Sequence, residues 1–350
     1  MSEKSFLKRR WKLILNIVTV AALIVLVYAI RHQLASTFDN LAKVNAIALL
    51  LIIPIEIWNY HAQAKLYQGL FGLVGNKLSY KFLFKASLEL NFINHVFPSG
   101  GVSGISYFGA RMRSDDITGG KATLVQMMKL ILGVVTFEVL LIVGLLFMAI
   151  GGRVNDLVIL VAGSLSTLMV VASFGFVFIV GSQTRINAFF TGLTKFLNRA
   201  IHVVRPKNSE TIKTERVQML FDEFHANYKL IESQYRRLGK PLWYAFVANL
   251  TEVLAVYVVF VAFGHWINFG SVVLAYAVAN IAGLISVLPG GVGIYEALMT
   301  AVLAAAGVSA GLSLPVIVMY RVVNTLIQLP PGYVYYHRTL NAREADKNRE

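Results

Sequence analysis

The stretch Asn280–Met299, NIAGLISVLPGGVGIYEALM, decides how this chain can fold. It is apolar at both ends, but a proline and three glycines interrupt its centre: Pro289, Gly290, Gly291 and Gly293. Proline breaks a helix, and lipid cannot satisfy the backbone groups that the break exposes. Such a segment survives at membrane depth only when it is buried in protein or lines a cavity. We therefore expect a helical hairpin that turns inside the protein rather than a straight span.

The composition places the whole chain in a membrane. Of its 350 residues, 57% are hydrophobic and 14% are charged, whereas roughly 25% are charged in soluble domains. Leu13–Ile30 has 18 residues without a charge, enough for one span. We interpret this run as a retained helix rather than a signal peptide, because no small-residue cleavage site follows it. The chain has no cysteine, which excludes disulfides and thiolate metal ligands.

The distribution of positive charge predicts the topology. The basic N-terminus, the basic segment 182–240 and the tail with Arg338 and Arg343 are expected in the cytoplasm. The expected full spans, about six in number, are 13–30, a span from 44, 123–150, 155–181, 242–264 and 314–336. This number of spans agrees with the charge distribution only if two further regions, 82–113 and 271–309, each enter and leave the membrane on the same side. The prediction is an all-α polytopic protein of the cytoplasmic membrane, a single domain over 1–350 with two re-entrant hairpins.

The two interrupted regions resemble each other. FPSGGVSGISYF, at Phe97–Phe108, carries Pro98, Gly100 and Gly101, and LPGGVGIYEAL, at Leu288–Leu298, carries the same Pro and Gly-Gly-Val elements. A cation follows each proline at nearly the same distance, 31 residues for Lys129 and 32 for Arg321. An intramembrane acid precedes each, Glu56 in the first half and Glu252 in the second. We predict an inverted repeat of 44–150 and 241–337, whose interrupted segments mark a central binding site.

The residue types at these segments favour an anionic ligand. Helix N-termini attract anions, and glycines let a ligand approach the backbone closely. A charge within the membrane is costly unless it faces a cavity or a partner. The predicted substrate-binding residues are Arg321, Lys129, Glu296, Asn94 and Asn324, together with Pro98, Gly100, Gly101, Pro289, Gly290, Gly291 and Gly293.

The roles of the acids stay open at this point. Glu296 pairs with Arg321, contacts a cationic headgroup, or carries a proton. Glu56, Glu138 and Glu252 are interpreted as counter-charges or proton sites. No cofactor or metal is expected, because the histidines lie apart and the P-loop, HExxH and GxSxG patterns are missing.

The cytoplasmic segment contains two amphipathic patterns. Apolar residues recur at helical spacing over 186–201, with basic residues beside them, and again over 217–231. A basic amphipathic helix is suited to an anionic membrane surface. For both patterns we favour docking against the membrane domain over a partner site, and nothing indicates a nucleic-acid partner.

Three motifs carry a family resemblance: PGGVGIYE at Pro289–Glu296, YRVVN at Tyr320–Asn324, and KLILG at Lys129–Gly133. With them the chain resembles, over nearly its whole length, the transmembrane family of lysylphosphatidylglycerol synthase/flippase. That family includes the membrane part of the multiple peptide resistance factor and stand-alone members. Two departures stand out. Lys129 occupies a position where the pattern has arginine, which keeps the charge but loses the planar fork. The spacing before Arg111 is also longer than in the pattern.

The resemblance implies a function for the membrane region. In two-part members it is implied to flip aminoacylated lipid, while a separate soluble domain transfers the amino acid. Only a short polar tail follows the last expected span, so no transferase domain is expected on this chain. The expected function is a translocase for a phosphate-bearing membrane phospholipid. The alternatives are a phosphatidylglycerol lysyltransferase or its membrane subunit, working with a separate synthase, and a secondary transporter of a small anion.

Overall fold

The computed structural model describes residues 44–97, 102–204, 214–285 and 292–347, and isolated residues near 21–32. The expected first span 13–30 and six hairpin residues, Pro98, Gly100, Gly101, Pro289, Gly290 and Gly291, lie outside this description. Every regular element in the described part is helical. Five helices there are long and apolar enough to cross a membrane: Ala46–Leu73, Gly119–Ile150, Asp156–Val180, Tyr235–Ala262 and Ala310–Ala342. The chain is an all-α polytopic membrane protein, as predicted.

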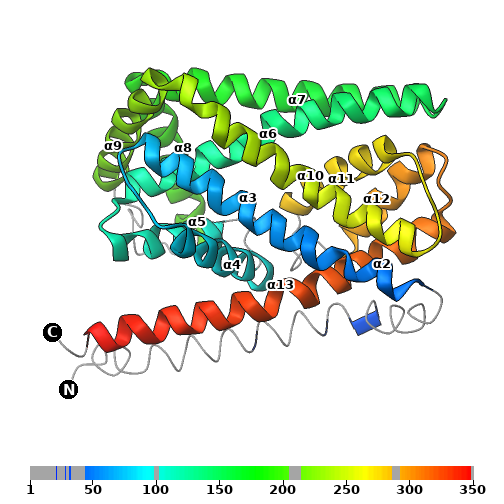
Figure 1. The fold of residues 1–350 in the computed structure, drawn as a ribbon. Helices are drawn as coiled ribbons and strands as arrows, with labels where there is room; N and C mark the ends of the chain where they lie inside the picture. Colours follow the sequence, from blue (N-terminus) through cyan, green and yellow to red (C-terminus); the bar gives the residue numbers. More distant parts are fainter. Residues whose placement is uncertain are drawn as a thin grey trace.

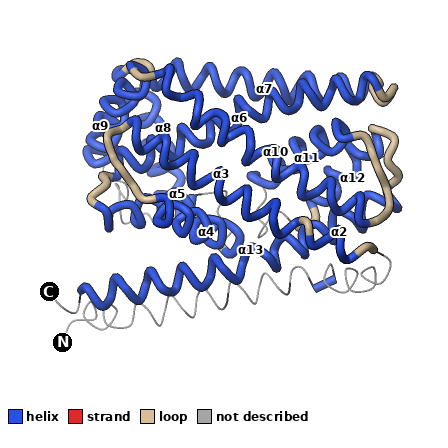
Figure 2. Tube along the Cα trace, viewed as in Figure 1, coloured by secondary structure: helices blue, strands red, loops and turns tan. Residues whose placement is uncertain are grey.

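The helices follow the predicted order with small shifts at their ends. They are α2 (Ala46–Leu50), α3 (Ile52–Leu73), α4 (Tyr80–Val96), α5 (Val102–Met112), α6 (Gly119–Ile150), α7 (Asp156–Val180), α8 (Gln183–Val204), α9 (Thr214–Ser233), α10 (Gly239–Ala262), α11 (Phe269–Ile285), α12 (Ile294–Ala305) and α13 (Ala310–Lys347). Short 3₁₀ turns, Arg113–Asp115 and Tyr235–Leu238, precede α6 and α10. Figure 2 shows these helices joined by short loops.

The two predicted hairpins lie at opposite ends of the molecule. In Figure 1, α4 and α5 lie toward the end that carries the chain's C-terminus, and α11 and α12 lie toward the other end. At that other end, Asn268 Nδ2 donates to the Phe147 carbonyl at 2.8 Å, and Asn155 Nδ2 donates to the Ala305 carbonyl at 2.8 Å. At the C-terminal end, Gln234 Nε2 donates to the Leu73 carbonyl at 3.4 Å.

The packing of the hairpins is reciprocal. α4 packs against α13, the helix that follows the second hairpin, and α11 packs against α6, the helix that follows the first. α3 and α10, the corresponding helices of the two halves, pack against each other at the centre. There Asn59 Nδ2 donates to Thr251 Oγ1 and to the Ala248 carbonyl, each at 2.9 Å. Two inverted repeats would pack in this way, although the repeat itself remains a prediction.

One helix contact brings two backbones together. A Cβ atom added to Gly270 at the start of α11 would lie 1.8 Å from the Gly144 carbonyl oxygen of α6. Small residues allow membrane helices to approach this closely. The second hairpin therefore packs against α6 through direct backbone contact as well as through side chains.

The segment between α7 and α10 forms α8 and α9. Phe221, Phe224, Tyr228 and Ile231 of α9 are buried in a core shared with α3 and α6. His225 of α9 contacts the Val180 carbonyl at the end of α7 through its Nδ1, at 2.8 Å. The docking predicted for the second amphipathic pattern is confirmed.

Candidate functional site

A polar stripe on α13 forms one wall of the candidate site. Arg321, Asn324 and Gln328 follow the spacing of one helical face. The Arg321 guanidinium donates to a Glu296 carboxylate oxygen and forms an ion pair. The side chain of Arg321 is 15% exposed and that of Glu296 is 5% exposed. The sequence left three roles open for Glu296. The structure shows one of them, the ion pair with Arg321.

Glu296 has a second attachment at the start of α12. Its carboxylate accepts a hydrogen bond from the Gly293 backbone N–H at 2.6 Å. Gly293 has a φ of +90°, in the region that favours glycine. A carboxylate at a helix N-terminus satisfies a free N–H and complements the helix dipole. Glu296 therefore joins the second hairpin to Arg321 of α13.

Arg321 faces a polar cavity of about 320 Å³ between the hairpins. Its lining comes from α4, α10, α11, α12 and α13: Asn91, Asn94, His95, Glu252, Tyr276, Asn280, Tyr295, Tyr320, Arg321, Asn324, Thr325 and Gln328. We call this the inner cavity. Three predicted substrate-binding residues, Arg321, Asn94 and Asn324, meet here with Glu252, a predicted counter-charge or proton site. The Arg321 guanidinium also lies 4.9 Å from the ring centre of Tyr295.

Lys129 lies in a second hollow, of about 370 Å³. We call it the middle hollow, and it shares Glu252, Tyr276 and Asn280 with the inner cavity. Lys129 Nζ donates to Gln63 Oε1 at 2.8 Å and lies 4.8 Å from the ring centre of Tyr67. The two predicted cations thus line adjoining hollows rather than one common site. The lining of the middle hollow combines polar side chains with apolar ones from α6, α7, α10 and α11.

The middle hollow continues into a groove between α6 and α7. This outer groove, of about 400 Å³, shares Val134 and Met169 with the middle hollow. Its lining is largely apolar and includes Phe174, which is 73% exposed on the outer surface. Glu138 also lies here and accepts a hydrogen bond from Ser166. The structure therefore places Glu138 apart from the inner cavity, where Glu252 lies.

A hydrogen-bond network connects the inner cavity to α3. Gln328 Nε2 donates to Glu56 Oε2 at 2.8 Å and to Asn324 Oδ1 at 3.1 Å. Asn91 Nδ2, on α4, donates to Gln328 Oε1 at 2.6 Å and also to the Tyr60 hydroxyl. The sequence prediction included Glu56 and Asn324 but missed Gln328. Gln328 could have been found in the sequence, because it continues the polar helical face that begins with Arg321 and Asn324.

Sequence comparison identifies the family. Residues 13–332 match the lysylphosphatidylglycerol synthase transmembrane region. The chain belongs to this family. The match contains every residue that lines the three hollows and ends within α13.

Relatives with curated names share shorter segments with this member of the family. The UPF0104 membrane protein PH1989 of Pyrococcus horikoshii is 30% identical over 102 residues, 29% of this chain and 30% of that protein. Two UPF0104 membrane proteins of Methanothermobacter thermautotrophicus are 27% identical over 140 residues and 29% identical over 103 residues. Those matches cover 40% and 29% of this chain, and 39% and 31% of the relatives. The aligned segments thus span less than half of each relative.

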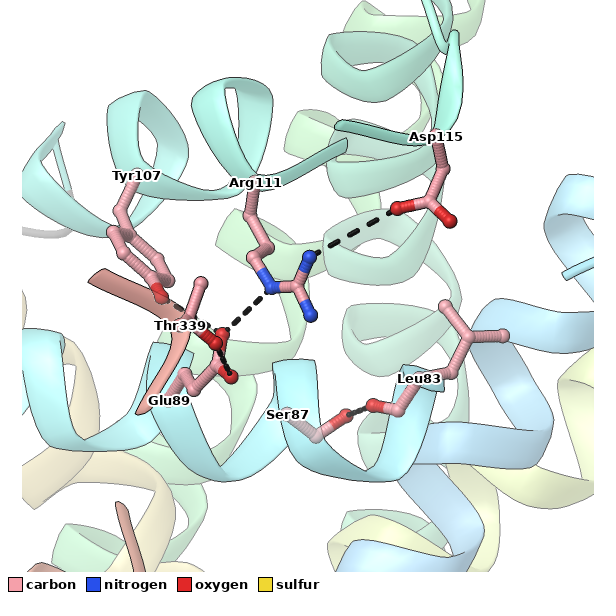
Figure 3. Close-up of polar contacts among 7 residues, drawn as sticks. All are labelled: Leu83, Ser87, Glu89, Tyr107, Arg111, Asp115 and Thr339. Carbon is pink, nitrogen blue, oxygen red and sulfur yellow. Dashed lines mark hydrogen bonds and ion pairs between the residues drawn. The ribbon is translucent and has the colours of Figure 1, made fainter. Parts of the chain in front are cut away.

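A second buried ion pair holds the first hairpin (Figure 3). Glu89 of α4 is 1% exposed and its Oε2 accepts from Arg111 Nε at 2.9 Å and from the Tyr107 hydroxyl at 2.7 Å. Glu89 Oε1 accepts from Thr339 Oγ1 of α13 at 2.7 Å. These contacts join both arms of the hairpin to α13. Arg111, whose spacing departs from the family pattern, therefore has a place in an ion pair outside the inner cavity.

Proposed function

We propose that this protein is a lipid translocase of the cytoplasmic membrane. Its cargo is a phosphate-bearing lipid such as aminoacylated phosphatidylglycerol, a choice that draws on the name of the family. The observation that carries the proposal is the spatial order of three adjoining hollows, from the inner cavity through the middle hollow to the outer groove. They change from polar at Arg321, through mixed at Lys129, to apolar between α6 and α7.

This gradient matches the chemistry of a phospholipid. Its phosphate fits a guanidinium, which binds such oxygens in a bidentate fork. Its acyl chains fit the outer groove, where exposed apolar side chains such as Phe174 face the surroundings of the protein. A lipid bound in this way keeps its chains in the bilayer while its headgroup lies inside. The middle hollow is the proposed lateral opening.

Alternating access would come from the two hairpins. By the distribution of positive charge, α4 and α5 enter from the cytoplasmic side and α11 and α12 from the opposite side. Rocking of two inverted repeats around a fixed central site is a common transport mechanism. The headgroup would then reach the inner cavity from one side at a time.

A liposome assay tests the proposal. The purified protein is reconstituted with headgroup-labelled phosphatidylglycerol, and a membrane-impermeant quencher is added outside. Translocation predicts fluorescence loss well beyond half. The double variant Arg321→Gln/Glu296→Gln removes the charge without leaving either partner unpaired, and its rate should fall about 10- to 100-fold, since hydrogen bonds to charged groups contribute about 1.5–3 kcal/mol.

The control uses an exposed ion pair on α9. Lys229→Gln/Glu232→Gln removes one cation and one carboxylate from the surface, outside the inner cavity and both hairpins. It should retain translocation. Loss that stops near half for the unaltered protein, with this lipid and with an isoprenoid phosphate, would reject the proposal. Equal translocation rates for the two double variants would show that Arg321 does not bind the lipid.

One observation favours a second candidate, a transporter of a small anion. Among the described residues, the side chains that line the inner cavity are polar or charged, including three tyrosines that combine an aromatic ring with a hydroxyl group. Such a transporter needs no contact with the outer groove. Uptake of inorganic phosphate into the same liposomes, without movement of labelled lipid, would support this candidate instead.

A further inference from the structure

Glu56 is an acid buried at the centre of the helix bundle. It lies on α3, where α10, α13 and α4 converge, and it is 1% exposed. Its Oε2 accepts from Gln328, whereas its Oε1 is buried without a hydrogen-bond partner among the described residues. Within the same part of the chain it makes no ion pair.

The surroundings of Glu56 disfavour a negative charge. A buried carboxylate without a charged partner is highly unstable relative to its protonated form. The titratable groups that interact with Glu56 are Glu252 on α10, Tyr60 on α3 and Tyr320 on α13. The other titratable side chains that line the inner cavity and the middle hollow are His95, Lys129, Tyr276, Tyr295 and Arg321. Asn59, one turn after Glu56, donates to Thr251, the residue before Glu252, at 2.9 Å, so both acids lie near the contact between α3 and α10. Two neighbouring acids in a buried site do not ionise together readily, so one retains a proton.

The position of Glu56 connects such a proton to the inner cavity. Gln328 contacts Glu56 and Asn324 through its amide nitrogen and Asn91 of the first hairpin through its oxygen. Pro330 and Pro331 follow on the same helix. Each proline lacks the N–H that would bond the preceding turn, which lowers the resistance of α13 to bending next to Gln328. A change of charge on Glu56 would therefore act where α13, α3 and the first hairpin meet.

We propose that Glu56 binds the proton whose movement drives lipid translocation. The proposal rests on the proposed function and adds its energy source. The proton binds at Glu56 in the conformation described here. In the alternate conformation the O–H bond of Glu56 breaks, its electron pair stays on the carboxylate, and the proton forms a new O–H bond with water to give hydronium. Lipid movement in one direction is thus coupled to proton movement across the membrane.

Infrared spectroscopy tests the bound proton without any lipid transport. The protein at neutral pH should show the carbonyl band of a protonated carboxylic acid, and Glu56→Gln should lack that component. Glutamine keeps the shape and an oxygen acceptor for Gln328, so the variant should unfold at nearly the same temperature. Glu232→Gln, on the exposed surface of α9, is the matched control and should retain the band. An unchanged band in Glu56→Gln would overturn the proposal.

Liposomes with an imposed pH gradient test the coupling. The steady-state distribution of labelled lipid should shift by up to about tenfold per pH unit for one proton per lipid, and the shift should reverse with the gradient. Glu56→Gln should equilibrate lipid without responding to the gradient, while Glu232→Gln responds normally. An unaltered protein that ignores the pH gradient, or that follows a sodium gradient instead, would overturn the coupling. A protein that moves no lipid under any gradient would overturn the proposed function, and the infrared band would still show whether Glu56 carries a proton.

Discussion

The contact between Gly270 and Gly144 gives the most direct test of the helix arrangement. In Gly270→Ala, the new Cβ would lie 1.8 Å from the Gly144 carbonyl oxygen. Real Cβ atoms essentially never come within 3.0 Å of another heavy atom, so α11 would have to move from α6 by about 1.2 Å. The obstacle is backbone, which cannot rotate away as a side chain can. We expect a loss of about 1–3 kcal/mol in the free energy of unfolding, as is typical of overpacked cores.

The same displacement would reach the candidate site. Tyr276 and Asn280 lie on α11 and line both the inner cavity and the middle hollow. Lipid translocation by Gly270→Ala should therefore fall together with the unfolding temperature. Both are measured on the purified protein, the temperature in detergent micelles and the translocation in liposomes.

A matched glycine provides the control. An added Cβ at Gly163, within α7, would meet no atom within 4 Å. Gly163→Ala should be neutral or slightly stabilising, because alanine favours a helix by about 1 kcal/mol over glycine. If Gly270→Ala were as stable as Gly163→Ala, then α11 would not pack against α6 as described here. That result would also contradict the reciprocal packing of the two hairpins.

Three further predictions concern polar side chains within the helix bundle. Arg321→Ala alone should lower the free energy of unfolding by about 3–5 kcal/mol, because it leaves Glu296 buried without its partner; the double variant Arg321→Gln/Glu296→Gln should unfold at a higher temperature, and the reverse order would contradict the ion pair. Asn249→Leu removes two hydrogen bonds to α6, at 2.7 and 2.9 Å, and should cost about 1–3 kcal/mol in chemical denaturation; no change would mean that water replaces the amide. Lys129→Met keeps an unbranched chain but removes the charge, and translocation should fall about tenfold or more, whereas an unchanged rate would exclude Lys129 from the lipid path.

The sequence predicted the fold well where physical constraints were strong. A span must be apolar over the thickness of the bilayer, so the ends of α6, α7 and α10 fell within a few residues of their predicted positions. The interruption between α11, which ends at Ile285, and α12, which begins at Ile294, could be predicted because a proline inside a helix breaks it. That each interrupted segment is re-entrant stays a prediction. What the sequence could not supply was which helices pack together, since lipid-facing and protein-facing positions are similarly apolar.

The candidate site was predicted in part. Arg321 and Lys129 could be predicted because a cation in an apolar membrane helix is energetically unfavourable unless it faces a cavity or a partner. Their division between two adjoining hollows depends on helix packing, which one sequence does not contain. Gln328 and Tyr276 were missed because a neutral polar residue in a membrane helix is common and carries little signal alone.

The Arg321–Glu296 pair has a consequence for how a lipid phosphate would act. A lone arginine would be too costly in an empty site, and Glu296 lowers that cost by pairing with it. Glu296 also accepts from Gly293 at the start of α12, so the pair connects the binding side chain to the second hairpin. Under the proposed function, a phosphate that competes for Arg321 weakens the attachment between α13 and α12. Binding of the lipid would then change the stability of the hairpin that moves, which is the differential interaction that a conformational change requires.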